Sequence, residues 1–362
     1  MQIPIVNAQF NTVIFEIIFW GAVILSIRKV KTDAIFAPFK TQEIKGFAIL
    51  AIIFSHIGYF LSTDTRFLYP MSVLAGVGVN LFLFLSGFGL AVSSIRKPLT
   101  IQGFYFRRLK KLFIPLWFIV SMFLILDYFT LGRSYQFSEI WKSFSGFFPV
   151  ADLFKNLNSP LWYFTLILFY YLIFPWTFFK RIPYLAPVLI IGLTYMLLKI
   201  ELPFEVSRDV MNLYKTHFAA FPFGVLFAVI INDESLNHLK GKFKEIFLKS
   251  NLKYLLIIIF GLLFGYFSIN SGVGDSKNIE QTISLLTMFS IIFLFVIKNF
   301  EIKLFTIFGI YSYEIYLIHW PILSRYDYLY IYLPAWLATV LYLILFLTLG
   351  YLLSKVVKRV ER

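Results

Sequence analysis

Apolar runs of about twenty residues recur along the whole chain, and they constrain the fold more than any other feature. A helix rises about 1.5 Å per residue, so a run of this length is what a bilayer crossing requires. The runs lie at about 10–27, 44–61, 71–95, 112–131, 161–179, 184–200, 217–232, 254–270, 281–298, 305–322 and 335–354. With 59% hydrophobic and only 14% charged residues, the chain has too few polar side chains for a soluble surface. The sequence therefore predicts an all-α, polytopic membrane bundle of about 11 transmembrane helices.

The Lys and Arg residues are distributed unequally between alternate connections. Connections 28–45, 96–111, 180–181, 233–253, 298–303 and 355–362 hold 24 of the 33. Cytoplasmic loops of membrane proteins carry such an excess. We therefore expect a multi-pass protein of a cell membrane, most simply a bacterial plasma membrane, with its N-terminus outside and its C-terminus in the cytoplasm. The formal net charge of +14 then reflects topology, and we predict no nucleic-acid partner.

The sequence also limits the possible metal and redox chemistry. It contains no Cys, which excludes disulfides, thiolate nucleophiles and iron–sulfur clusters. With four His residues, a metal site would need carboxylates that the apolar runs mostly lack. We predict no metal site and no permanently bound cofactor.

Ionisable side chains inside the apolar runs are candidates for a functional site, because a charge in hydrocarbon costs several kcal/mol. His56 lies ten residues after Gly46, and Glu314 lies about nine residues into its run, so both are expected about 15 Å from the cytoplasmic face. This shared depth predicts that Glu314 orients His56 as a general base, although either side chain could instead serve helix packing. Glu16 and Asp127 lie toward the outer ends of their runs, where we expect their side chains to reach the membrane surface.

Two further segments attract attention near the cytoplasmic side. Ser86 and Gly87 are expected at the depth of His56, where small residues let either a ligand or another helix approach. Segment 96–111 contains six Lys or Arg residues, and Arg108 and Lys111 would share a face if it is helical. Such a face could clamp phosphates, or it could be attracted to anionic lipid head groups.

Five blocks in this order resemble the acyltransferase 3 family of membrane O-acyltransferases, from about residue 40 to the C-terminus. They are Lys45-Gly46 through His56, Phe84 to Phe88, Arg107 to Lys111 with Pro115, Leu161-Trp162-Tyr163 through Pro175, and Ser312-Tyr313 through His319-Trp320-Pro321. The family has ten helices, so the resemblance implies an extra N-terminal helix and basic loop at 1–39 and an acyltransferase domain at 40–362. The family's basic loop has two arginines three positions apart, and the second is Lys111 here.

The resemblance implies an O-acyltransferase that moves an acyl group, most simply acetyl, from cytoplasmic acyl-coenzyme A to a hydroxyl of a cell-surface or lipid-linked carbohydrate. In this interpretation His56 is the general base, or it accepts the acyl group first, and Glu314 lies beside it. The donor would be held by Arg107, Arg108, Lys111 and Lys45. The residues expected to contact substrate or to pack around it are Ser86, Gly87, Trp162, Tyr163 and His319.

Two other classes of function remain open at this point. A transporter or flippase of a lipid-linked glycan could use His56 and Glu314 as a proton relay. A membrane scaffold without catalytic activity would not explain the free-energy cost of ionisable groups inside the membrane. Consumption of acetyl-coenzyme A by the purified protein distinguishes the acyltransferase from both.

Overall fold

The computed structural model describes residues 2–30, 34–97, 99–151, 157, 159–200, 206–246, 251–271 and 277–361. Its α-helices are α1 (Ala8–Leu25), α2 (Pro38–Ser55), α3 (Ala75–Arg96), α4 (Ile101–Leu131), α5 (Phe137–Ser145), α6 (Trp162–Thr177), α7 (Leu185–Leu197), α8 (Arg208–His217), α9 (Ala220–Asn232), α10 (Asn237–Lys244), α11 (Leu252–Ile269), α12 (Lys277–Ile297), α13 (Lys303–Ile310), α14 (Ser312–Arg325), α15 (Leu329–Tyr332) and α16 (Ala335–Glu361). The shorter elements are the π-helical turn η1 (His56–Leu61), the 3₁₀ turns η2 (Met71–Val73), η3 (Ser159–Leu161) and η4 (Glu234–Leu236), and strands β1 (Ile27–Lys29) and β2 (Phe300–Ile302).

Each predicted run forms helix, but not every run is one long helix. Among the described residues, eight helical segments are long and apolar enough to cross a membrane. Helices α6 and α7 are apolar but have only 16 and 13 residues, and the run predicted at 305–322 is divided at Tyr311 into α13 and α14. The chain is therefore a polytopic helical membrane bundle, with eight helical segments of full spanning length in its described part, whereas the sequence predicted about 11 spans.

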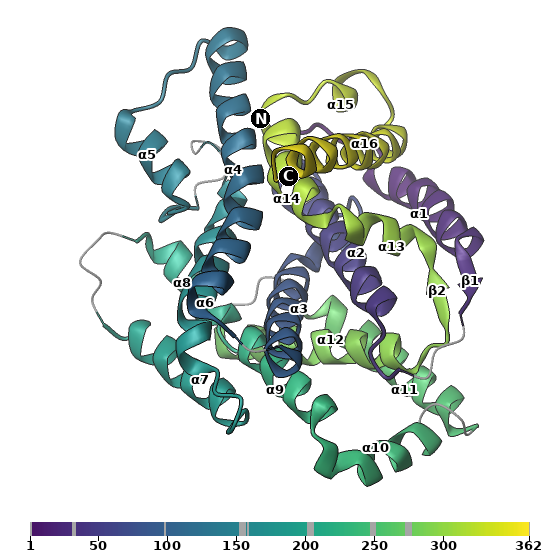
Figure 1. Ribbon diagram of the computed structural model, residues 1–362. Coiled ribbons are helices and arrows are strands. Elements are labelled where there is room, and N and C mark those ends of the chain that lie inside the picture. The colour runs from purple at the N-terminus through teal and green to yellow at the C-terminus, as the bar shows by residue number, and fades with distance from the viewer. Residues whose placement is uncertain are drawn as a thin grey trace.

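Several boundaries differ from the prediction in ways that affect the site. Helix α4 begins at Ile101, eleven residues before the predicted run, so the basic segment that precedes Leu112 is helical. The connections predicted at 132–160 and 233–253 contain the short helices α5 and α10 (Figure 1). Residues 152–156, 158 and 247–250 of these connections lie outside the described residues.

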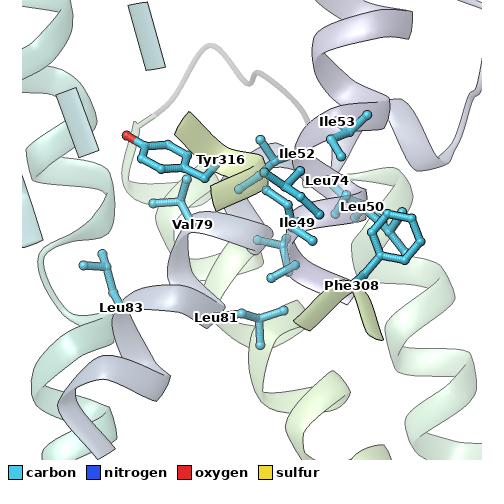
Figure 2. Packing of buried hydrophobic residues seen from close by; sticks show 14 of the residues in the cluster. Ile49, Leu50, Ile52, Ile53, Leu74, Val79, Leu81, Leu83, Phe308 and Tyr316 are labelled. Atoms are coloured by element: carbon cyan, nitrogen blue, oxygen red, sulfur yellow. The ribbon is translucent and has the colours of Figure 1, made fainter. Parts of the chain in front are cut away.

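Helix α2 forms the centre of the bundle. It begins with Pro38, whose fixed φ suits the first helical turn, and 78% of its most apolar stretch is buried. Figure 2 shows Ile49 and Ile53 of this helix among apolar side chains of α3, α13 and α14. Helix α11 lies at the periphery instead, with only Ser268 buried among its described residues. Such an apolar, uncovered face is what lipid solvates.

Glycines allow the central helices to approach closely. A Cβ on Gly46 of α2 would lie 1.9 Å from the backbone oxygen of Phe305 in α13, and one on Gly309 would lie 1.8 Å from the oxygen of Gln42. Helices α3 and α9 meet in the same way at Gly87 and Gly224. The close approach at Gly87 supports helix packing, the alternative that we considered for this residue.

Backbone pairing joins two connections that the charge pattern assigned to one side. Strand β1 pairs with β2 in antiparallel register, Ile27 with Ile302. Nearby, the Glu43 carboxylate is buried and accepts from Lys298 Nζ and from the backbone amide of Ile302, both at 2.5 Å. We call this part of the bundle, with the α3–α4 connection, the basic end.

The opposite end gathers the segments that the charge pattern assigned to the other side. The amide of Ile3 donates to the carbonyl of Leu61, and the amide of Trp336 donates to Asn11 Oδ1 at 3.1 Å. Asp127 lies at this end of α4, but the expectation that it reaches the membrane surface is wrong. Its carboxylate is fully buried, 3.3 Å from Arg325 Nη1, and it accepts from the Tyr326 hydroxyl. An acid with a cation and a phenol as partners has no need to reach water.

Candidate active site

A cavity of about 560 Å³ lies between α2, α3, α6, α8 and α12, and His56 lines it. His56 begins the π-helical turn η1, which continues α2, and its exposed fraction is 8%. A π-helical turn interrupts regular helical packing and is frequent at functional sites. The other polar residues of the lining include Ser55, Tyr59, Ser72, Asp209, Asn212, Thr216, His217, Ser271, Glu280 and Ser284.

His56 is paired with His319, which lies 263 residues later on α14. The two ring nitrogens, His56 Nδ1 and His319 Nε2, are 2.7 Å apart and buried. The rings are nearly parallel, with an interplanar angle of 7° and centroids 4.9 Å apart. The ring of Trp320 lies edge-on to His56 at 4.8 Å. The imidazole of His56 is thus held on two sides.

Backbone contacts of His319 determine where the protons of this pair lie. His319 Nδ1 is 3.0 Å from the carbonyl oxygen of Ile315 and 2.9 Å from that of Tyr316. A carbonyl only accepts, so Nδ1 of His319 carries the hydrogen and its Nε2 is an acceptor. His56 therefore donates from Nδ1 to His319, which leaves the lone pair of the His56 ring on Nε2. This is the tautomer that a general base requires.

The structure corrects the pairing predicted between His56 and Glu314. His319 takes the position beside His56 Nδ1. Glu314 precedes His319 by five residues, which rotates its side chain by about 140° around α14 and moves it about 7 Å toward the basic end. Glu314 instead interacts electrostatically with Lys45. The position of Glu314 in its apolar run predicted its depth in the bundle, but not the direction of its side chain.

A second hollow of about 500 Å³ lies at the basic end, between the end of α3 and the start of α4. Its lining includes Lys97, Arg107 and Arg108, with the hydroxyls of Ser93, Ser94 and Thr100. Three cations with hydroxyl donors form a suitable environment for an anion. Lys111 is exposed and does not line this hollow, so the pairing of Arg108 and Lys111 in one clamp needs correction.

Polar side chains connect the neighbourhood of Arg108 with the cavity at His56. Arg108 interacts electrostatically with Lys45 and with Tyr171. Ser86 is a neighbour of the phenols of Tyr171 and Tyr163. Tyr163 in turn lines the cavity. Polar side chains, Ser86 among them, therefore lie between Arg108 and the cavity, and we call them the polar path.

Trp162 and His217 form another wall of the cavity. Their rings are stacked with centroids 5.7 Å apart. His217 Nδ1 lies 2.8 Å from Asn80 Oδ1, and Asn80 Nδ2 donates to Ser284 Oγ at 2.8 Å. These contacts join α3, α6, α8 and α12 around the cavity. Trp162 and Tyr163 thus both line the cavity that contains His56.

Sequence reasoning missed the acids of this cavity because they lie outside the apolar runs. Asp209 is in the first turn of α8, and Glu280 is in the first turn of α12. Because only ionisable residues inside the apolar runs were considered, neither Asp209 nor Glu280 was selected. His217, at the first residue of a predicted run, was equally accessible to that search and was not selected.

Comparison with known proteins gives one match. A family model described as an acyltransferase domain, Acyl_transf_3, matches residues 44–355. The matched part begins in α2 and ends in α16, so it contains His56, His319 and both hollows. No curated protein and no solved structure matches the chain.

Proposed function

Because the chain belongs to the acyltransferase 3 family and is a membrane acyltransferase, we propose that it transfers an acyl group, most simply acetyl, from acyl-coenzyme A to a carbohydrate hydroxyl. The carbohydrate is on the cell surface or linked to lipid. The observation that carries this proposal is the buried pair of His56 and His319, which leaves a basic lone pair on His56 beside a cavity large enough for a sugar.

The donor enters from the basic end, which the distribution of Lys and Arg predicts to be cytoplasmic. Arg107, Arg108 and Lys97 surround the hollow there and would hold the phosphates of the donor. Lys45 lies close enough to Arg108 to interact with it, and so contributes to the same positive field. The thioester then extends along the polar path toward His56, while the acceptor enters the cavity.

His56 acts on the acceptor hydroxyl in this mechanism. Its Nε2 takes the hydroxyl proton as the acceptor oxygen attacks the thioester carbonyl carbon. The carbon–sulfur bond breaks, the thiolate of coenzyme A leaves, and the proton on His56 passes to that sulfur. His319 keeps the imidazole in place and stabilises its cationic form by accepting from Nδ1. Direct transfer fits this arrangement because donor and acceptor reach His56 from different hollows. The alternative, acyl transfer to His56 first, predicts ping-pong kinetics.

The proposal is tested with purified protein in detergent or liposomes, labelled acetyl-coenzyme A and glycan acceptors. His56→Ala should reduce transfer by at least about 10²-fold, the usual contribution of a positioned base. His238→Ala is the matched control, because His238 is exposed on α10. Wild-type rates in His56→Ala would refute the assignment of the base. Glycan movement without consumption of acetyl-coenzyme A would favour the transporter.

A further inference from the structure

The cavity that contains His56 has a charge opposite to that of the chain as a whole. Its described lining includes two carboxylates, Asp209 and Glu280, and none of the described lining residues is Lys or Arg. The complete sequence carries a formal net charge of +14. Negative charge is therefore concentrated in the cavity, while the cationic hollow at the basic end contains Lys97, Arg107 and Arg108.

The two carboxylates come from neighbouring helices and line one cavity. Helices α8 and α12 pack against each other, and each acid is in the first turn of its helix. Partial positive charge at a helix N-terminus favours a negative side chain there. The two acids thus place negative charge on the wall of the cavity that α8 and α12 contribute.

Two hydroxyls in the same cavity provide an independent sign of a ligand. Ser55 and Ser72 are each 1% exposed, both line the cavity, and neither Ser55 Oγ nor Ser72 Oγ has a hydrogen-bond partner. A buried hydroxyl without a partner is a free-energy cost that a polar ligand removes. Ser55 directly precedes His56 in the sequence, so such a ligand would lie beside the proposed base.

We propose that this cavity binds a neutral, polyhydroxylated sugar ring and rejects an anionic one, and that Asp209 and Glu280 set this preference. Carboxylate oxygens only accept, so they suit the hydroxyl donors of a sugar and repel a uronate or phosphate. Ser55 and Ser72 can donate or accept, and aromatic side chains such as Trp162 and Tyr59 offer apolar ring faces. This inference rests on the proposed function, because it names the acceptor class of that site.

The test measures acceptor binding without a donor. The probes are methyl β-glucopyranoside and methyl β-glucopyranosiduronic acid, which share a ring and differ in one carboxylate. Binding to the purified protein is followed by tryptophan fluorescence, since Trp162 lines the cavity, and Trp162→Phe should remove the signal. The wild-type protein should bind the uronic acid at least about tenfold more weakly, as expected for like charges near a protein surface.

Variants assign the preference to the two acids. The double variant Asp209→Asn with Glu280→Gln should reduce the difference between the glycosides to less than about threefold. Glu139→Gln is the matched control, because Glu139 lies on α5 and does not line this cavity. If the double variant does not fold, added salt provides the second measurement, because screening should narrow the difference in the wild-type protein.

The outcomes separate this inference from the proposed function. Equal binding of the two glycosides by the wild-type protein, binding of neither, or an unchanged difference in the folded double variant would overturn the acceptor preference. Selective binding of the neutral glycoside without acetyl transfer would support the preference and count against the acyltransferase mechanism. Equal acetyl transfer to both glycosides would support the acyltransferase mechanism and count against the acceptor preference.

Discussion

Replacement of His319 by alanine tests the central pair of the site. In the proposed reaction His56 becomes cationic as it takes the acceptor proton, so its 2.7 Å contact with His319 becomes a charge-assisted hydrogen bond. Hydrogen bonds to charged groups contribute about 1.5–3 kcal/mol. Since about 1.4 kcal/mol corresponds to a factor of ten in rate, His319→Ala should lower kcat about 10- to 150-fold.

The assay is steady-state acetyl transfer at saturating acceptor with varied acetyl-coenzyme A. The KM for the donor should stay near its wild-type value, because the cationic hollow is separate from His319. His319→Gln should recover part of the loss, since its amide oxygen can accept from His56 Nδ1. Thermal unfolding in detergent is measured in parallel, because His319 is fully buried and the alanine variant loses packing.

Two results would refute this reasoning. A wild-type kcat in a folded His319→Ala variant would mean that the pair does not support His56 during the reaction. A loss in His319→Gln as large as that in His319→Ala, with both variants equally stable, would mean that acceptance of the Nδ1 hydrogen is not what His319 contributes.

Three further predictions concern the donor hollow and the packing of the bundle. Arg108→Ala should raise the KM for acetyl-coenzyme A about tenfold or more, whereas Lys111→Ala should change it by less than about threefold, because Arg108 lines the hollow and Lys111 does not; donor titrations check this. Lys298→Met should destabilise the protein by about 3–5 kcal/mol in denaturant unfolding, because it leaves a buried carboxylate at the basic end without its cation. Gly46→Ala should lower the unfolding temperature and the yield of folded protein, because the new Cβ would lie 1.9 Å from a backbone oxygen of α13, whereas Gly89→Ala meets nothing within 4 Å and should leave both unchanged.

Much of the membrane architecture could be predicted from local patterns. Each apolar run forms helix because a backbone in lipid must satisfy its hydrogen bonds within the segment. The charge pattern correctly grouped the connections that carry β1 and β2 at one end of the bundle. What the pattern missed was the length of single helices, since Tyr311 divides one run and α7 has only 13 residues.

The sequence could identify residues of the candidate site, but it could not show which of them contact one another. His56 and Glu314 were selected because ionisable groups are rare in apolar runs, and His319 was selected through the family resemblance. Their pairing depends on which way each side chain points around its helix. A rotation of about 140° around α14 separates His319, which contacts His56, from Glu314, which interacts electrostatically with Lys45.

By itself, the sequence determined that this chain is a helical membrane protein, that connections rich in Lys and Arg gather at one end, and which family it resembles. These properties follow from hydrophobicity, charge and short motifs, all of which act locally. Only the tertiary structure decided that His319 is the partner of His56 and that Asp209 and Glu280 share its cavity. Those contacts join residues far apart in the chain, and they exist because close helix packing fixes the rotation of each helix as well as its depth.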